Sequence, residues 1–428
     1  MQHFDLVTLI QGELWERLDR LVIVERMDSI TPIVGKATTL IGMRRAGKTF
    51  CLYHLLQQLK SRGIPRESIL FLNLEDDRLQ IRNAEGLTKT IGLFFSEIPA
   101  NYKRQTYILL DEVQSVKGWE RVARRLIETD RCQLWLTGSS AQMLSREVAT
   151  SFRGRSIAHE VWPFSFSETA RARNVELPDP TISFSDRDHA RESLVNYLIC
   201  GGFPEVIAVP AMIRRRILDD YRQLVILRDV IERHRVTNIL ALDQLVSTVI
   251  ANSGRLLSVN KTHADFKSRG IAVGKDTLFE YLSYLEDAYL TFLVPPYSES
   301  LRARSTAPKK VFCVDTGMVA NYSIRPRADL GRLFENLIYI ELRRAGYRVY
   351  YYTTQSGAEV DFVAVDTDGH RSLIQVCYDS GDPDTLDRET RALKEAQKEL
   401  KCGGGLITPL EYLKNELLPM ITNGQAIK

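Results

Sequence analysis

Residues 42–49 read Gly42-Met43-Arg44-Arg45-Ala46-Gly47-Lys48-Thr49 and match the pattern GxxxxGK[ST]. An apolar run at 37–41 precedes the pattern and predicts a strand, and a second run from Phe50 to residue 56 predicts a helix. In that context the N–H groups of the loop and of the first helical turn face a phosphate group. Residues 42–50 therefore form a predicted binding site for ATP or GTP.

The residue types inside this loop each suit phosphate binding. Lys48 supplies a positive charge for the β- and γ-phosphates, and Thr49 supplies a hydroxyl for Mg²⁺. Gly42 and Gly47 permit a close backbone approach that a Cβ would obstruct. The alternative is a chance Gly/Lys turn, and a second motif downstream argues against it.

That second motif lies at 107–112, where an apolar run ends in Asp111 and Glu112. The run is too short for a helix and is typical of a buried parallel strand that ends at the functional edge of a sheet. We expect Asp111 to face the metal ion and Glu112 to orient or polarise the attacking water. The alternative is a strand that ends in a solvated acidic turn.

A third apolar segment, at 133–136, ends in Thr137-Gly138-Ser139-Ser140. If it is a strand of the same sheet, its hydroxyl side chains reach the edge where the carboxylates lie. We therefore predict that Ser139 or Thr137 senses the γ-phosphate.

The order and spacing of these motifs resemble the AAA+ ATPases. Residues 151–155, Ser-Phe-Arg-Gly-Arg, fall where an arginine of such proteins reaches the nucleotide of a neighbouring subunit. The resemblance implies ATP rather than GTP, a ring or another homo-oligomer, and Arg153 and Arg155 as arginine-finger candidates. The alternative is that one or both arginines pair with surface acids.

Further stretches carry a narrower resemblance. They are LLDEVQ at 109–114 with Trp119-Glu120 downstream, LTGSS at 136–140, FRGR at 152–155, GGFPEV at 201–206, TLFEYLSYLEDAYL at 277–290, KVFCVDTGM at 310–318 and GAEVDF at 357–362. Together with GMRRAGKT they resemble one family of prokaryotic AAA+ ATPases that carry a C-terminal domain of unknown function. The likeness covers nearly the whole chain, but it does not by itself identify an activity.

Composition predicts a soluble protein of several domains. The chain has 428 residues, of which 44% are hydrophobic and 26% charged, and this length corresponds to about three domains. No apolar stretch approaches the roughly 18 residues that suggest a membrane span, and the N-terminus lacks a signal-peptide pattern. Six cysteines without a CxxC pair indicate neither zinc nor a disulfide framework. We expect a cytoplasmic protein with no membrane partner.

A net charge of +3 does not by itself indicate nucleic-acid binding, so the distribution of charge matters more. Residues 214–235 are rich in arginine and carry an apolar stripe at helical spacing. The AAA+ resemblance implies that this helix belongs to a lid beside the nucleotide. Its arginines form either a solvated face or a face that contacts nucleic acid or senses the nucleotide.

Three helices are predicted next, at 243–251, 260–268 and 275–287, with glycines in the turn between the last two. This pattern indicates a helix-turn-helix inside a winged-helix domain, with residues 289–294 beginning the wing. Such domains bind DNA or dock proteins. The predicted DNA contacts are Lys275, Thr277, Arg302, Arg304, Lys309 and Lys310.

The last third resembles the restriction-endonuclease-like fold, through Glu335 on a predicted helix at 332–345, Asp361 in a hairpin and a strand at 373–377. In an active member, two carboxylates hold Mg²⁺ and a lysine assists the attacking hydroxide. Here Gln375 replaces the second acid and Cys377 replaces the lysine. We therefore predict a degenerate site, unless a cation such as Arg371 or Lys394 enters it.

The predicted architecture is α/β throughout, with a P-loop AAA+ domain at 1–178, a helical lid at 179–238, a winged helix at 239–310 and a nuclease-like α/β domain at 311–428. The leading functional hypothesis is ATP hydrolysis with Mg²⁺, coupled to binding or remodelling of DNA, including branched DNA. One alternative is a regulatory NTPase switch whose C-terminal domains bind a protein partner. A second alternative is an ATP-gated nuclease.

Overall fold

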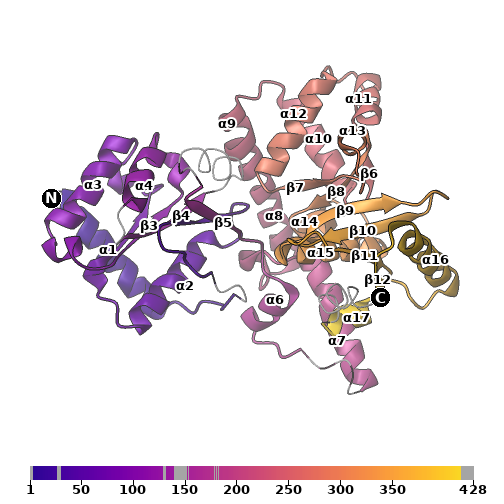
Figure 1. Cartoon of the computed structure of the whole chain (residues 1–428), viewed down its shortest axis with the longest axis horizontal. Helices are drawn as coiled ribbons and strands as arrows, with labels where there is room; N and C mark the ends of the chain where they lie inside the picture. The colour runs from indigo at the N-terminus through magenta and orange to yellow at the C-terminus, as the bar shows by residue number, and fades with distance from the viewer. Residues whose placement is uncertain are drawn as a thin grey trace. The chain divides into compact units, whose positions relative to one another are not determined.

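The computed structural model describes residues 3–26, 30–128, 132–138, 152, 154–177, 179, 181 and 183–415. The chain divides into two compact units, Met1–Trp162 and Pro163–Lys428. Figure 1 shows both units, and each is described by itself below.

The N-terminal unit contains a five-stranded parallel sheet in the order β2-β3-β4-β1-β5. Its strands are β1 (Ala37–Ile41), β2 (Ile69–Asn73), β3 (Thr106–Asp111), β4 (Cys132–Gly138) and β5 (Ser156–Glu160). The strands predicted at 37–41, 107–112 and 133–136 are confirmed to within two residues. Because all five strands run in parallel, their carboxyl ends share one edge, and the predicted nucleotide motifs follow β1, β3 and β4 there.

Helices cover this sheet. They are α1 (His3–Arg20), α2 (Lys48–Ser61), α3 (Ala84–Ser96) and α4 (Trp119–Ile127), joined in part by 3₁₀ turns at Arg66–Ser68, Asp77–Leu79, Pro99–Tyr102 and Val113–Ser115. The main core packs apolar side chains of α1 and α2 against the sheet, including Trp15, Leu56 and Phe71. The carboxyl end of β1 and the beginning of α2 are thereby held rigidly at either side of the glycine-rich loop.

The C-terminal unit begins with helices. These are α6 (Phe166–Ala172), α7 (Phe184–Cys200), the 3₁₀ turn Pro204–Val206, and α8 (Ala211–Val225), which continues through a π-helical turn at Ile226–Ile231 into α9 (Glu232–His234). The predicted apolar stripe at 214–235 is buried at Leu218, Tyr221 and Val225. Two of its arginines pair with acids, Arg222 with Asp243 and Arg228 with Glu232.

Three helices and a small antiparallel sheet follow. The elements are α10 (Ile239–Ala251), β6 (Leu256–Leu257), α11 (Val259–Ser268), α12 (Lys275–Asp287), β7 (Thr291–Val294), α13 (Leu301–Thr306) and β8 (Lys309–Cys313). The strands are ordered β6-β8-β7. Arg302 and Arg304, two of the predicted DNA contacts, lie on helix α13, which precedes β8.

A mixed four-stranded sheet completes the unit. After α14 (Thr316–Asn321) and the 3₁₀ turn Pro326–Asp329 come α15 (Leu330–Arg344), β9 (Arg348–Thr353), β10 (Glu359–Val365), β11 (Arg371–Val376), α16 (Pro383–Leu400), β12 (Gly404–Ile407) and α17 (Pro409–Leu413). The sheet order is β12-β11-β10-β9, with β11 and β12 parallel and the other neighbours antiparallel. The α/β class predicted from the sequence is confirmed in both units.

The motifs GGFPEV and KVFCVDTGM pack against each other in the interior of the C-terminal unit. Asp315 accepts hydrogen bonds from the N–H of Gly202 at 2.7 Å and the N–H of Met318 at 3.1 Å. A Cβ on Gly201 would lie 2.1 Å from Asp315 Oδ1, and one on Gly202 would lie 2.0 Å from the carbonyl oxygen of Phe164. Only glycine fits at either position, so these two motifs serve packing of the chain.

The carboxyl of Asp315 predicts a pH dependence of stability. Burial raises its pKa from 3.8 to about 6, although backbone N–H donors oppose the shift. The folded state therefore holds more protons than the unfolded state between these values, and the contribution of this group to stability falls as pH rises from about 4 to about 6. The fall amounts to about 3 kcal/mol.

Asp315→Asn removes this titration, so we expect the variant to gain up to about 3 kcal/mol relative to the parent protein between pH 4 and pH 7. Urea titrations read by pulsed hydrogen exchange in peptides of the C-terminal unit measure this difference. Asp276→Asn, at an exposed position of α12, is the matched control. A pH-independent difference between Asp315→Asn and the parent protein would contradict the prediction.

Candidate functional site

The glycine-rich loop has the backbone that phosphate binding requires. Gly42 has φ +148, and a Cβ there would lie 2.2 Å from the carbonyl oxygen of Val161. Gly47 has φ +105 and immediately precedes α2. Both positions exclude other residues for steric reasons. The loop therefore delivers the N-terminus of α2 to the shared edge of the parallel sheet, where its free N–H groups favour an anion.

Lys48 is folded into this loop. Its side chain is 3% exposed, and its ammonium donates to the carbonyl oxygens of Gly42 at 3.0 Å and Met43 at 3.2 Å. Its Nζ also lies 3.9 Å from a carboxylate oxygen of Glu112. The charge is thus placed inside the loop, next to the acidic end of β3.

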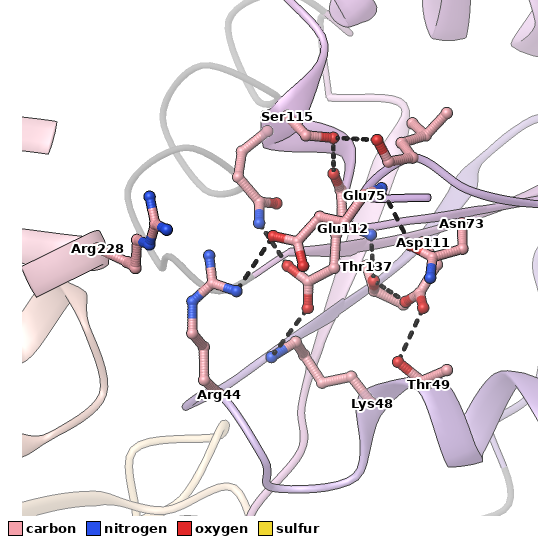
Figure 2. Close-up of polar contacts among 12 residues, drawn as sticks. Arg44, Lys48, Thr49, Asn73, Glu75, Asp111, Glu112, Ser115, Thr137 and Arg228 are labelled. Atoms are coloured by element: carbon pink, nitrogen blue, oxygen red, sulfur yellow. Dashed lines mark hydrogen bonds and ion pairs between the residues drawn. The ribbon is translucent and has the colours of Figure 1, made fainter. Parts of the chain in front are cut away.

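Thr49, Asp111 and Thr137 form one hydrogen-bonded row (Figure 2). Thr49 Oγ1 donates to one oxygen of Asp111 at 2.8 Å, and Thr137 Oγ1 donates to the other. Burial, and then the charge of Glu112, raises the pKa of Asp111 to about 6, against the effect of the two hydroxyls and Lys48. A hydroxyl and a buried carboxylate are hard oxygen donors, and this pair fits Mg²⁺.

Thr137 has a different place from the one expected of a γ-phosphate sensor. It is fully buried, and its hydroxyl accepts the N–H of Glu112 at 2.9 Å while it donates to Asp111. The hydroxyl therefore orients the two acidic residues. Ser139, the other predicted sensor, lies outside the described residues.

Glu112 follows the end of β3 in a left-handed conformation, with φ +55. Such a backbone is costly for a residue with a Cβ and is found preferentially at functional sites. It turns the carboxylate toward Lys48, and Gln114 Nε2 donates a hydrogen bond to Glu112 Oε2. Sequence reasoning did not identify Gln114, although it lies within the same LLDEVQ motif.

Arg44 extends the site toward the end of β2. Its guanidinium pairs with Glu75 at 3.2 Å, and the N–H of Glu75 donates to Asn73 Oδ1 at 3.0 Å. Figure 2 draws Arg44, Glu75 and Asn73 at the same sheet edge as Lys48 and Glu112. Asn73 and Glu75 were not predicted, although an apolar strand ending in polar residues was a readable signal.

Arg26 is a further residue that local patterns did not reveal. It donates to the carbonyl oxygen of Ala46 at 3.1 Å and to that of Trp162 at 2.5 Å. These bonds tie the loop to the segment that follows β5. Of the other predicted loop residues, Met43 and Ala46 are fully buried, Arg45 has φ +69, and Phe50 is exposed at the start of α2.

Of the two arginine-finger candidates, only Arg155 lies among the described residues. Arg153 lies outside the described residues. Arg155 is exposed, and its carbonyl oxygen accepts the N–H of Ala37 at 2.9 Å, so the base of its side chain is anchored where β5 begins.

In the C-terminal unit, Lys310 is not a surface cation. Its side chain is 2% exposed, and Nζ lies 2.9 Å from Glu335, 2.6 Å from Glu359 and 2.9 Å from Asp361. Burial alone would lower the pKa of Lys310, but the three carboxylates outweigh it and raise that pKa well above its ordinary value. The prediction that Lys310 contacts DNA is therefore wrong, because no surface remains for a phosphate.

The other predicted members of the degenerate nuclease site are also engaged elsewhere. Gln375 Oε1 accepts the N–H of Asp361 at 3.2 Å, and Gln375 Nε2 donates to Glu389. Cys377 is buried, and burial raises the pKa of its thiol. Lys394 is exposed and Arg371 contacts Tyr297, so the cation of the cluster comes from β8 and not from either of these.

The remaining predicted DNA contacts lie on α12, on α13 and on strand β8 of the three-stranded sheet. Lys275 is exposed at the first position of α12. Thr277, at the third position of the same helix, is half-buried. Arg302 is exposed on α13, whereas Arg304 and Lys309 are half-buried.

Among the residues with described positions, no helix is both long and apolar enough to span a lipid bilayer.

Comparison with protein families matches three successive segments of the chain. Residues 34–170 match an AAA domain, 191–327 match a domain of unknown function (DUF8612), and 330–416 match a second one (DUF4143). The AAA match covers the loop, Asp111 at the end of β3, Glu112 just after it, and the chain as far as α6. It agrees with the site built from the geometry.

Two uncharacterized proteins are similar to this chain over most of its length. One from Methanocaldococcus jannaschii is 30% identical over 383 residues, which is 89% of this chain and 82% of the relative. One from Haemophilus influenzae is 29% identical over 328 residues, covering 76% of this chain and 79% of the relative.

Two solved structures match the chain at lower sequence identity. The Walker-type ATPase of Pyrococcus abyssi is 13% identical, covers 73% of this chain and 94% of its own, and has a TM-score of 0.42. The Aeropyrum pernix Orc1 protein, solved in complex with DNA, is 15% identical, covers 75% and 94% respectively, and has a TM-score of 0.30.

Proposed function

Because this chain belongs to the same family as the uncharacterized Methanocaldococcus jannaschii protein and its residues 34–170 match an AAA domain, we propose that it is an ATPase that couples hydrolysis to the binding or remodelling of DNA. The observation that carries the ATPase proposal is the convergence of Lys48, Thr49, Asp111 and Glu112 at one sheet edge. ATP is preferred to GTP because the matching domain is an AAA domain.

The site residues divide the chemistry among them. Thr49 and Asp111 would hold Mg²⁺, which when bound neutralises phosphate charge. Lys48 exchanges the carbonyl oxygens of Gly42 and Met43 for phosphate oxygens. Glu112, held by Gln114 and by its backbone bond to Thr137, orients and polarises the attacking water. Arg155 or Arg153, supplied to a neighbouring subunit, stabilises charge on the transferred phosphoryl group, so the active form is a homo-oligomer.

The order of elements in the C-terminal unit supports the DNA part of the proposal. Three helices with a sheet ordered β6-β8-β7 support a winged helix within 239–310, and α15-β9-β10-β11-α16-β12 supports a nuclease-like module within 311–428. We assign 1–178 to the ATPase domain and 179–238 to the helical lid. Lys275, Thr277, Arg302, Arg304 and Lys309 remain the candidate contacts to DNA.

The alternative is a regulatory switch in which the winged helix binds a protein. DNA-stimulated turnover distinguishes the two functions. Stimulation by single-stranded, duplex or junction DNA supports the coupled ATPase, whereas turnover that is equal with and without all three supports the switch.

If DNA binds through phosphates, its affinity falls with salt by a log–log slope of about −0.9 per neutralised phosphate on duplex DNA. Lys275→Glu and Lys309→Glu should each weaken binding at low salt and reduce the magnitude of that slope by about 1. Fluorescence anisotropy with labelled duplex between about 50 and 200 mM salt measures this. Lys394→Glu, an exposed charge on α16, is the control. Equal slopes in all variants would remove these two lysines from the interface.

A further inference from the structure

The buried charge cluster around Lys310 joins three elements that are distant in sequence. Its ammonium comes from β8, and the carboxylates come from α15 and β10. Glu335 and Asp361 are 14% and 13% exposed, and Glu359, at 38%, closes the outer side. An ammonium has three N–H donors, and here three carboxylates lie within 2.9 Å of the nitrogen.

Independent contacts aim Lys310 at this position. Asn336, next to Glu335 on α15, accepts the N–H of Cys313 at 2.8 Å and donates to the carbonyl oxygen of Cys313 at 3.0 Å. The ring of Phe312 stacks on Tyr339 with centroids 4.5 Å apart. Strand β8 is thus fixed to α15 by hydrogen bonds and packing as well as by charge.

The resemblance to restriction endonucleases implies Mg²⁺ at this place, but the side chains do not fit it. Mg²⁺ requires oxygens at 2.0–2.1 Å in near-octahedral geometry, so its ligand atoms lie within about 4.2 Å of one another. Within the described part of the chain, three such atoms within 4.8 Å of one another occur only at the surface turn of Asp366, Asp368 and His370. The three carboxylates around Lys310 do not form such a group, and its ammonium fills the space between them at 2.6–2.9 Å from each.

The hydrogen bonds of the neighbouring side chains lead to the same conclusion. Asp361 uses one oxygen for Lys310 and the other for the N–H of Val376 at 3.0 Å. Both ends of the Gln375 amide are bonded, to the backbone of β10 and to Glu389. A neutral Gln375 also reduces the negative charge that a single ammonium must balance.

We propose that the ammonium of Lys310 permanently occupies the cation position of the nuclease-like module, which makes the cluster a metal-independent lock between β8 and the four-stranded sheet. Position 377 lacks the lysine of an active nuclease, and Lys310 from strand β8 provides the positive charge instead. Lys310 holds the carboxylates together and does not assist hydrolysis. This inference is independent of the ATPase proposal, because it concerns residues outside the nucleotide site.

The first test measures Mn²⁺ binding by electron paramagnetic resonance in the Asp111→Asn protein, in which the nucleotide site lacks its metal ligand. We expect no stoichiometric Mn²⁺ site that depends on Asp361 at concentrations up to about 1 mM, whatever Mn²⁺ binds at the surface turn of Asp366, Asp368 and His370. One Mn²⁺ per chain that disappears on adding Asp361→Asn would overturn the proposal. So would Mg²⁺- or Mn²⁺-dependent DNA cleavage that Asp361→Ala abolishes.

The second test measures the lock itself. Lys310→Met leaves three buried carboxylates without their cation, so the melting temperature of the C-terminal unit should fall by about 10 °C, with lost hydrogen-exchange protection in β8, α15 and β10. Lys309→Met changes the adjacent residue of the same strand and should leave both unchanged. Equal stability of the two variants would overturn the lock. If Lys310→Met does not fold, the Mn²⁺ measurement decides the proposal alone, because it is made on protein that keeps Lys310.

Discussion

Lys48→Ala is expected to weaken ATP binding and to lower ATP turnover by at least about 10²-fold, the loss found when one positioned donor to transition-state charge is removed. The ammonium of Lys48 bonds to the carbonyl oxygens of Gly42 and Met43 and lies 3.9 Å from Glu112. The methyl group of alanine leaves the phosphates without that charge. Phosphate release and binding of a fluorescent ATP analogue measure the two effects.

Glu112→Gln separates binding from hydrolysis at the same site. Glutamine keeps the size and the bond to Gln114 but cannot polarise water as a carboxylate does, so we expect retained ATP binding with turnover reduced by about 10²–10⁴-fold. Lys60→Ala, at an exposed position of α2 paired with Asp19, is the matched control. All four tryptophans lie in the N-terminal unit, so their emission verifies that it is folded in every variant. Unchanged turnover in both Lys48→Ala and Glu112→Gln would refute the site assignment.

Arg155→Ala is expected to lower kcat by about 10³-fold or more while ATP binding persists, because an arginine finger acts on charge that develops only in the transition state. The exposed side chain of Arg155 on an anchored backbone suits a contact with a neighbouring subunit. Arg121→Ala, on the exposed side of α4, is the control for loss of a surface arginine.

Mixing inactive subunits tests whether this arginine acts in trans. In an oligomer of Arg155→Ala and Glu112→Gln subunits, some sites combine an intact Glu112 with an intact Arg155 from the neighbour, so turnover should partly recover. Turnover in the mixture equal to the sum of the separate proteins would argue against a shared site. An unchanged kcat in Arg155→Ala alone would remove this residue from the mechanism.

The nucleotide site could be predicted from the sequence because its signals are local. The strand at 37–41, the glycines at 42 and 47 and the acidic end of the 107–112 segment each depend on neighbours within a few residues, and parallel strands then bring them to one edge. Helix 275–287 was predicted with the bounds that the structure has, for the same reason.

The sequence by itself thus determined the loop, its lysine and hydroxyl, and the acidic pair, because glycine conformation and apolar periodicity act at short range. Only the tertiary structure decided which partners they have: Thr137 under Asp111, Arg26 behind the loop, Asp315 against Gly202 and Lys310 among its carboxylates. Lys310 lies 25 residues from Glu335 and 51 from Asp361 along the chain. Its contacts arise from packing of β8 against α15, and no pattern of neighbouring residues encodes that packing, so a lysine that appeared to be a surface charge became the buried centre of a cluster.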